Sequence, residues 1–291
     1  MLSVEIDPGS GFCGGVIRAI TQAENELAQG GKLYSLGAIV HNEAELSRLE
    51  EKGLVTVNSL AEVPAGETVL IRAHGEPPST YQEARDRSLN LIDCSCPVVL
   101  QLQRSIRDAY ARLHQGGNRG TVVIFGRVGH AEVLGLLGQV GADALVVENT
   151  EMLEAALANG SLDLSRPVEI FSQTTKSPAE YDQICALLQE RGAQLTVHQT
   201  ICAQVASRHR KLVEFARGHD VILFVSGRSS SNGKVLSELC RSVNPRTFVI
   251  GHLDEIDPAW VQDGDRVGIC GATSTPKWML EAVADALRER N

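Results

Sequence analysis

The sequence predicts an α/β fold in which mostly parallel sheets are covered by helices. Short β-branched runs alternate with helical patterns from one end of the chain to the other. These runs are almost continuously apolar, which is typical of strands buried on both faces of a parallel sheet. Several helical patterns close with a glycine, the residue that most readily ends a helix.

The elements can be assigned in chain order from this alternation. The runs expected to form strands are SVEI, LYSLGAIV, TVLIRA, LNLID, TVVIFG, ALVVE, VEIFS, QLTVHQ, VILFVS, TFVIG and RVGIC. The segments between them predict helices, among them AELSRLEEKG, VLQLQRSIRDAYARL, AEYDQICALLQERG and PKWMLEAVADALRER. Strands that alternate with helices in this way indicate crossover units and parallel pairing.

Composition limits the class of protein. A chain of 291 residues can bury a substantial core, and its 43% hydrophobic and 22% charged residues are ordinary for a globular protein. Its formal net charge of −9 argues against binding to nucleic acid or to an acidic membrane surface. The sequence opens without a signal-like segment and contains no apolar run of about 18 residues, so we expect a cytoplasmic protein with no membrane partner.

A weak internal repeat predicts the domain organisation. A strand, a short turn, a cysteine and a helix occur in this order three times: VEIDPGSGFC before GGVIRAI, LIDCSC before PVVLQLQRSI, and LTVHQTIC before AQVASRHRKLVEF. The copies are about one small α/β domain apart. We therefore expect similar α/β domains at residues 1–96, which include the N-terminal strand and the Cys13 turn, at 97–201 and at 202–291. No Pro/Ser-rich linker separates them, so they should pack as one body.

The seven cysteines fall into two groups. Structural disulfides are not expected in the predicted compartment. Cys185 and Cys240 lie in apolar helical patterns and are interpreted as packed core thiols. Cys270 is expected to be buried, and Cys94 to be structural or a near neighbour of the site. The other three each lie on a short turn flanked by Gly or Pro: Cys13, Cys96 and Cys202.

Three cysteines far apart in sequence suit a cluster or metal held between domains. None of them shows the close pairing usual in zinc sites. An iron–sulfur cube normally takes four thiolates; with three, one iron keeps an open position and can act as a Lewis acid. The pattern therefore favours a reactive site over a simple electron relay.

Polar residues gather where the predicted strands end. In open parallel sheets, ligands bind beyond the carboxyl ends of the strands. The polar residues in these positions are His41, Asn42, His74, His130, Glu132, Gln173, Thr174, Thr175, Ser230, Ser231, Asn232 and Ser274. If the three domains surround an axis with their loops inward, the cysteines meet at the centre and these side chains line a pocket.

A dinucleotide-binding loop is the first alternative, because GSGFCGG at residues 9–15 contains GxGxxG. Such a loop needs an acidic residue at the end of the second strand. That strand reads LYSLGAIVHN and ends without one. We interpret the glycines as allowing a sharp turn against a bulky cluster, with Cys13 at its tip.

Nine motifs in order resemble the LytB (IspH) family of 4-hydroxy-3-methylbut-2-enyl diphosphate reductases. They are GFCGGVIRAI, VHN, AHG, CSCPVV, GHAEVLGLLGQ, QTT, TIC, SSSN and STP, and they extend from Gly11 to Pro276. The resemblance implies three similar domains around a central cavity, in a trefoil-like arrangement. It also implies a [4Fe–4S] cluster on Cys13, Cys96 and Cys202.

The resemblance further implies an activity, the last step of non-mevalonate isoprenoid synthesis. The substrate, an allylic diphosphate, loses its hydroxyl and gives isopentenyl and dimethylallyl diphosphates, with electrons from a ferredoxin- or flavodoxin-like donor. A monomer or weak dimer is expected. The residues implied to bind substrate are His41, His74, His130, Gln173, Thr174, Thr175, Ser230, Ser231, Asn232 and Ser274. Those implied to be catalytic are His130, Glu132 and Thr174, the last two through proton delivery.

Each of these residues also has a structural interpretation when taken alone. A histidine is more often packed or solvated than functional, and Glu132 suits the first turn of a helix. SSSNG alone would be an ordinary turn, and TSTP an N-cap. The sequence also departs from the family pattern after Cys202 and at SSSNG, near residues 230–233. Two alternatives stay open: a divergent paralogue that reduces another small substrate, and a non-catalytic iron–sulfur sensor or carrier.

Overall fold

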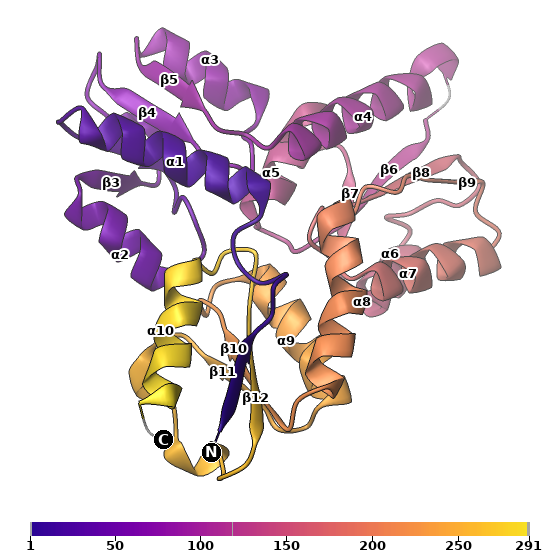
Figure 1. Ribbon diagram of the computed structural model, residues 1–291. Helices are drawn as coiled ribbons and strands as arrows, with labels where there is room; N and C mark the ends of the chain where they lie inside the picture. The colour runs from indigo at the N-terminus through magenta and orange to yellow at the C-terminus, as the bar shows by residue number, and fades with distance from the viewer. Residues whose placement is uncertain (1, 118, 290–291) are drawn as a thin grey trace. The chain divides into compact units, whose positions relative to one another are not determined.

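The computed structural model describes residues 2–117 and 119–289, and every strand pairing it gives is parallel. The strands are β1 (Ser3–Ile6), β2 (Leu33–Leu36), β3 (Leu54–Val57), β4 (Thr68–Ile71), β5 (Asn90–Asp93), β6 (Thr121–Phe125), β7 (Leu145–Val147), β8 (Val168–Ser172), β9 (Leu195–Val197), β10 (Val221–Val225), β11 (Thr247–Ile250) and β12 (Arg266–Gly271) (Figure 1). The α/β class and its parallel sheets are thus confirmed.

Helices alternate with these strands. They are α1 (Gly14–Ala28), α2 (Glu43–Glu51), α3 (Pro78–Asp86), α4 (Pro97–Leu113), α5 (Ala131–Leu137), α6 (Thr150–Ala158), α7 (Pro178–Glu190), α8 (Ala203–Arg217), α9 (Ser231–Val243) and α10 (Lys277–Arg288). Glycines in the left-handed region follow α2 and α7, at Gly53 (φ +108°) and Gly192 (φ +82°), as the sequence predicts for helix ends. No helix in the described ranges combines the length and the apolar composition that a bilayer span requires.

The chain divides into two compact units. The first contains the residues up to Ser59 together with those from Ala203 onward, and the second is Leu60–Cys202. The first strand shows why the N-terminal segment belongs with the C-terminal one: β1 pairs along its whole length with β12, from Ser3 beside Arg266 to Ile6 beside Ile269. The sequence pattern groups this strand with the first predicted domain. Its apolar side chains instead complete the sheet of the C-terminal third.

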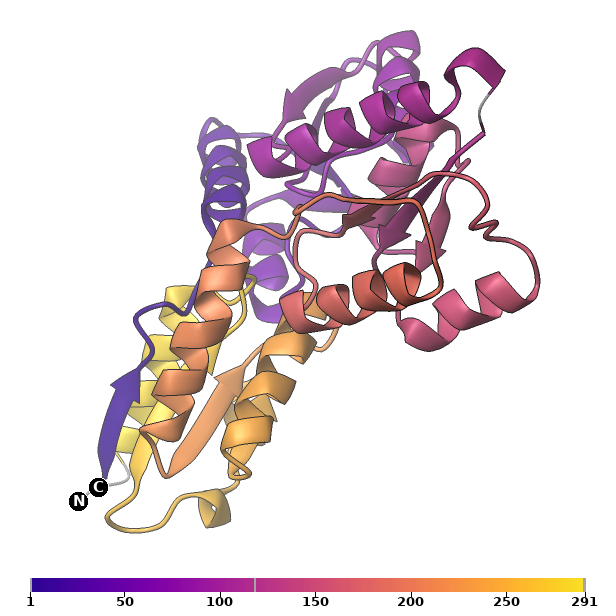
Figure 2. The ribbon, with the colours of Figure 1, turned by 90° about the vertical axis from the view of Figure 1, so that its right-hand side faces the viewer.

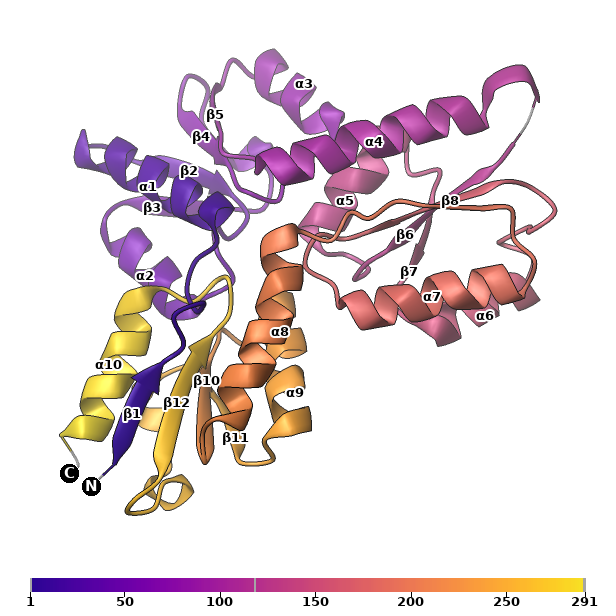
Figure 3. The same cartoon turned by 45° about the vertical axis from the view of Figure 1, so that its right-hand side comes forward.

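That sheet has the order β1-β12-β10-β11 and is covered on both faces (Figure 3). Leu223 and Val225 of β10 pack against α10, whereas Ile222 and Phe224 point the other way, toward α8 and α9. The helices α8 and α9 pack beside each other on that face (Figure 2). Alternate residues of a strand face opposite sides, so a strand buried on both sides reads as a continuous apolar run.

The sheet of the second unit repeats this design with the order β7-β6-β8-β9. Val123 and Phe125 of β6 pack against α6 and α7, and Val122 and Ile124 pack toward α4 and α5. The remaining strands form the parallel pairs β2–β3 in the first unit and β4–β5 in the second. β3 is not among the runs that the sequence predicts, because LVTV is short and directly follows a helix.

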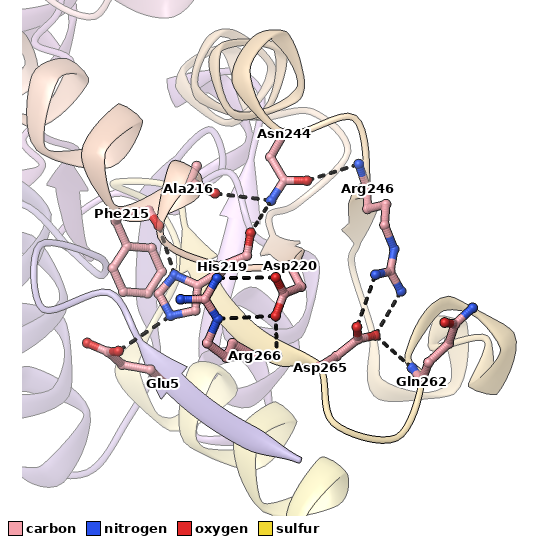
Figure 4. Close-up of polar contacts among 10 residues, drawn as sticks. All are labelled: Glu5, Phe215, Ala216, His219, Asp220, Asn244, Arg246, Gln262, Asp265 and Arg266. Atoms are coloured by element: carbon pink, nitrogen blue, oxygen red, sulfur yellow. Dashed lines mark hydrogen bonds and ion pairs between the residues drawn. The ribbon is translucent and has the colours of Figure 1, made fainter. Parts of the chain in front are cut away.

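A polar network closes the amino-terminal end of the β1-β12-β10-β11 sheet (Figure 4). Arg266 of β12 donates to both carboxylate oxygens of Asp220, at 3.2 Å each. The Asn244 amide donates to the main-chain carbonyls of Ala216 (3.0 Å) and His219 (2.9 Å). These contacts join strand starts to helix ends, at the edge opposite the carboxyl ends from which functional loops emerge.

Candidate functional site

Three of the seven cysteines share one local geometry. Cys13, Cys96 and Cys202 each follow a strand and directly precede a helix, namely α1, α4 and α8. All three are partly exposed, whereas the other four cysteines are buried, and none of the seven forms a disulfide within the described residues. Each thiol thus stands at the N-terminus of a helix of 15 or 17 residues, where the helix dipole favours a negatively charged ligand.

The main chain of each of these cysteines is anchored to a loop that carries predicted site residues. In the first unit, the Cys13 N–H donates to the carbonyl of Thr273 (3.3 Å), the neighbour of Ser274. In the second unit, the Cys96 N–H donates to the carbonyl of Ala73 (3.0 Å), the neighbour of His74.

The third anchor follows the same rule. The Cys202 N–H donates to the carbonyl of Thr174, at 2.9 Å. Thr174 belongs to the loop after β8 and is itself one of the residues that the sequence singles out. All three anchors therefore tie a potential thiolate ligand to a loop at the carboxyl end of a strand.

A buried carboxyl group lies at the centre of the second unit's part of the site. Glu132, in the first turn of α5, is 2% exposed. Its Oε1 accepts from the main-chain N–H of Thr174 (2.7 Å), and its Oε2 accepts from the Thr174 hydroxyl (2.8 Å). The side chain therefore points to the loop after β8, which a solvent-exposed first-turn acid would not do.

Burial controls the ionisation of this carboxyl group. Removal from water raises the pKa of Glu132 to about 7, although the two hydrogen bonds from Thr174 oppose the rise. A carboxylic acid with this pKa is divided between its neutral and charged forms near neutral pH. Such a group can store a proton and release it.

Two histidines lie next to Glu132. The His130 Nδ1 accepts from the main-chain N–H of Glu132 (3.2 Å), so the neutral ring carries its hydrogen on Nε2. The rings of His74 and His130 meet edge to face, with 5.3 Å between their centroids. His130 is 9% exposed, and both histidines follow strands, β4 and β6 respectively.

Gln173 and Thr175 shape the loop that holds Thr174. The Gln173 side chain accepts from the main-chain N–H of Arg127 (3.0 Å) and donates to the Thr175 hydroxyl (3.2 Å). Its main-chain N–H donates to the carbonyl of Phe125 (2.8 Å). Gln173 thus connects the loop after β8 with the loop after β6, and holds Thr174 opposite Glu132.

The first unit contributes a cluster of buried hydroxyl and amide groups. The Ser230 and Ser274 hydroxyls are 3.0 Å apart, and Ser230 Oγ also accepts from the N–H of Gly233 (3.0 Å) as the N-cap of α9. Asn232 Oδ1 accepts from the main chain and the hydroxyl of Thr273, at 3.0 Å each. Ser230, Asn232 and Ser274 are 4–7% exposed, and Ser231 is half-buried at the first residue of α9.

His41 lies beside this cluster because a glycine allows it. Gly227 follows β10, and a β-carbon there would collide with the main-chain carbonyl of His41 and approach the Cα of Asn42 to 2.9 Å. Asn42 in turn caps α2 by accepting from the N–H of Glu45 (3.0 Å). The first unit therefore brings together Cys13, His41 and the hydroxyl cluster, and the second brings together the remaining predicted site residues.

Sequence reasoning missed two contributors, Thr273 and Gly227. Thr273 anchors both Cys13 and Asn232, but only its neighbour Ser274 stands out in the sequence. The signal for Gly227 was present as a glycine after an apolar strand, a position where close backbone approach is common.

A raised-pKa acid among buried donors at the carboxyl ends of parallel strands is an arrangement typical of enzyme active sites. Comparison with known proteins agrees. The family model described as LytB protein matches residues 4–288. The chain therefore belongs to the LytB family and is an oxidoreductase.

Relatives of known name cover the whole chain. A Bacteroides fragilis protein named 4-hydroxy-3-methylbut-2-enyl diphosphate reductase is 45% identical, over 99% of this chain and 98% of its own length. A Chloroherpeton thalassium protein of the same name is 40% identical, over 99% and 96%.

Two solved structures share the fold. The structure of a reductase of that class from Plasmodium falciparum aligns with a TM-score of 0.87 at 24% identity, over 99% of this chain and 87% of the other. A structure described as (E)-4-hydroxy-3-methyl-but-2-enyl diphosphate reductase, the terminal enzyme of the non-mevalonate pathway, aligns at 0.70 and 32% identity, over 99% and 100%.

Proposed function

We propose that this chain reduces 4-hydroxy-3-methylbut-2-enyl diphosphate to isopentenyl and dimethylallyl diphosphates. Two electrons and two protons are consumed, the allylic C–O bond breaks, and the oxygen leaves as water. The observation that carries the proposal is the buried Glu132–Thr174 pair, which supplies a proton donor with a pKa of about 7. The names of the full-length relatives support the choice of substrate.

The cofactor of this reaction is proposed to be a [4Fe–4S] cluster held by Cys13, Cys96 and Cys202. The residues fit such a group, because three partly exposed thiols outside any disulfide each stand at a helix N-terminus, whereas the other four cysteines are buried. When bound by only three thiolates, the cluster supplies single electrons and a Lewis-acidic iron position.

The diphosphate is proposed to bind neutral donors rather than Lys or Arg. Hydroxyl, amide and imidazole N–H groups can each donate to phosphate oxygens, and donation to an ionised acceptor gives a strong hydrogen bond. The proposed binding residues are His41, His74, His130, Ser230, Ser231, Asn232 and Ser274, while Gln173 and Thr175 hold the loop that carries Thr174.

Proton delivery is assigned to Glu132 and Thr174. In the neutral acid the 2.8 Å contact has the opposite direction from that in the carboxylate, with the Glu132 O–H donating to Thr174 Oγ1. The acid passes this proton to Thr174 Oγ1, which passes its own hydroxyl hydrogen on to the substrate. The carboxylate left behind is stabilised at once by the main-chain N–H of Thr174, 2.7 Å from Oε1. The donor therefore works near neutral pH without a bulk water molecule beside it.

An anaerobic assay tests the proposal. Protein purified without oxygen should contain iron and sulfide and should reduce the hydroxymethylbutenyl diphosphate when dithionite-reduced methyl viologen supplies electrons. A brown protein that is inactive on this substrate would favour a paralogue with another substrate, or a sensor or carrier. Spectral change on adding the diphosphate would support the paralogue over the carrier. A colourless zinc protein would contradict all three.

The proposal also requires an external one-electron donor, ferredoxin- or flavodoxin-like in size and potential. The expected monomer or weak dimer, the cytoplasmic location, and the three-domain boundaries at 96/97 and 201/202 stay predictions. Gel filtration tests the expected oligomeric state, and limited proteolysis tests the domain boundaries.

A further inference from the structure

A second cavity reaches Cys13 within the first unit. It has a volume of about 450 Å³ and lies between the N-terminal loop and α8. Five residues of α8 line it, and their spacing places them on one face of the helix: Gln204, Ser207, Arg208, Lys211 and Leu212. None of this unit's proposed diphosphate-binding residues lines the cavity, so it approaches Cys13 by a separate route.

The floor of this cavity holds a buried cation, Arg208, and a buried carboxylate, Asp7. Arg208 is 7% exposed, and its guanidinium donates to the Ser10 hydroxyl (3.1 Å) and to the main-chain carbonyl of Gly271. Ser10 in turn donates to the Asp7 carboxylate (2.7 Å). These bonds connect α8 to the loop that precedes Cys13 and to the end of β12.

The rim of the cavity is cationic although the chain as a whole is acidic. The helix α8 carries four Arg or Lys residues and a single carboxylate, Glu214, in a chain of net charge −9. Arg210 and Lys211 are exposed, and neither forms an ion pair within the described part of the chain. Their charges are therefore available to an approaching partner.

An apolar side chain stands beside these cations. Ile17, in the first turns of α1, lines the same cavity and is 51% exposed. The first turn of α1 contains no acidic residue, and Arg18 follows Ile17 on the surface. A small apolar centre with charges around it is the composition of a weak, transient protein interface.

We propose that this surface, formed by Ile17, Gln204, Ser207, Lys211 and the neighbouring Arg210, docks a small acidic one-electron carrier protein, whose electrons enter through Cys13. The proposal rests on the proposed function. Electron transfer weakens steeply with distance, so a carrier must approach a cluster ligand closely. Opposite charge supplies both orientation and encounter rate. Each encounter oxidises one carrier by one electron, and two encounters supply the two electrons for each hydroxyl released as water.

Charge reversal at the rim tests this surface. In Lys211→Glu, kcat/KM for reduced flavodoxin should fall about tenfold or more at low ionic strength. Turnover driven by reduced methyl viologen should stay within about twofold, because this small mediator needs no docking surface. The loss should shrink as salt is added, since salt screens the interaction between exposed charges.

Lys32→Glu is the matched control. Lys32 is also an exposed lysine of the first unit, but it lies beyond the opposite end of α1, so the same charge change there should leave flavodoxin-driven turnover unaltered. Ile17→Asp gives an independent second variant with the same expected loss as Lys211→Glu.

Measuring the affinity for flavodoxin tests the docking surface independently of the proposed function. Titration of flavodoxin against the holoenzyme should give a Kd that Lys211→Glu raises about tenfold and Lys32→Glu does not. Equal affinity and equal flavodoxin-driven rates in Lys211→Glu and the unaltered protein would overturn the docking surface. Failure of the unaltered protein to turn over with methyl viologen would instead overturn the proposed function, and the titration would still decide the docking.

Discussion

The Glu132 carboxyl group and Thr174 are joined by two hydrogen bonds, one from the main chain and one from the side chain of the threonine. One residue thus fixes the carboxyl orientation and also provides the hydroxyl through which a proton can leave. Thr174 further accepts from the N–H of Cys202, so the proton donor is two hydrogen bonds away from a proposed cluster ligand.

Replacement of Glu132 by Gln should nearly abolish turnover while the protein stays folded and keeps its iron. Gln preserves the shape and the acceptor for the Thr174 N–H but has no acidic proton, and loss of a general acid typically lowers kcat by about 10²–10⁴-fold. Steady-state kinetics with a chemical reductant measure turnover, and iron analysis measures whether the protein keeps its iron. Glu169→Gln is the control, because Glu169 is a buried carboxylate of β8 outside the site. Full activity in Glu132→Gln would remove the proton role.

Thr174→Val should separate the two hydrogen bonds. Val keeps the main-chain N–H but lacks the hydroxyl, so the proton path is broken and turnover should fall by about tenfold or more. The pKa of Glu132 should rise further, because the lost bond stabilises the carboxylate. Thr174→Ser restores the hydroxyl and should recover most of the activity. Equal turnover rates for Thr174→Val and Thr174→Ser would show that the Thr174 hydroxyl takes no part in proton delivery.

The stability of the protein should fall as pH rises through the pKa of Glu132. Between its unfolded value of 4.5 and its folded value of about 7, the native state binds a proton that the unfolded state has lost. The stabilisation is complete below pH 4.5 and is lost as pH rises through 7, a change of about 3 kcal/mol. Urea unfolding at pH 5 and pH 8 measures it. Glu132→Gln should show a smaller difference, and an identical difference would contradict the assignment.

Iron content should distinguish the two groups of cysteines. Replacement of Cys13, Cys96 or Cys202 by Ser should reduce iron and sulfide to a small fraction of the unaltered protein, because a ligand thiolate is lost. Cys185→Ala should retain both, since this thiol packs in the core of the second unit against α6 and α7. Unchanged iron in any of the three Ser variants would exclude that residue from the ligand set.

Gly227→Ala should weaken substrate binding and reduce stability. The added methyl group would meet the main chain of His41 and Asn42, so the loops after β2 and β10 must separate. Overpacking of this kind costs about 1–3 kcal/mol. KM for the diphosphate should rise and the melting temperature should fall. Gly251→Ala is the control, because a β-carbon there meets nothing closer than 3.7 Å.

Much of the fold could be predicted from the sequence because both faces of each main sheet are buried. Strands such as β6 and β10 read as unbroken apolar runs for that reason. The strand β3 was not predicted because it is short. The sheet that contains β1 could not be identified from the sequence, because strand order depends on contacts between distant segments. Hydrophobic pattern fixes the type of an element but not its partner.

The candidate site could likewise be predicted only in part from the sequence. Cys13, Cys96 and Cys202 could be selected because a strand, a turn and a helix surround each of them. The pairing of Glu132 with Thr174 could not, since the two residues are 42 positions apart and meet only after two strands have aligned. Gly227 carried a signal, a glycine just after an apolar strand, but its partner His41 could not be identified because the two residues are far apart in the sequence.

The two ends of the β1-β12-β10-β11 sheet carry polar residues for different purposes. At the amino ends, Arg266 binds Asp220, and Asn244 binds the main chain of Ala216 and His219. At the carboxyl ends lie Cys13, Ser230 and Ser274. Substitutions along the first edge therefore leave these proposed site residues untouched, so the scaffold can be altered at one margin while the chemistry is kept at the other.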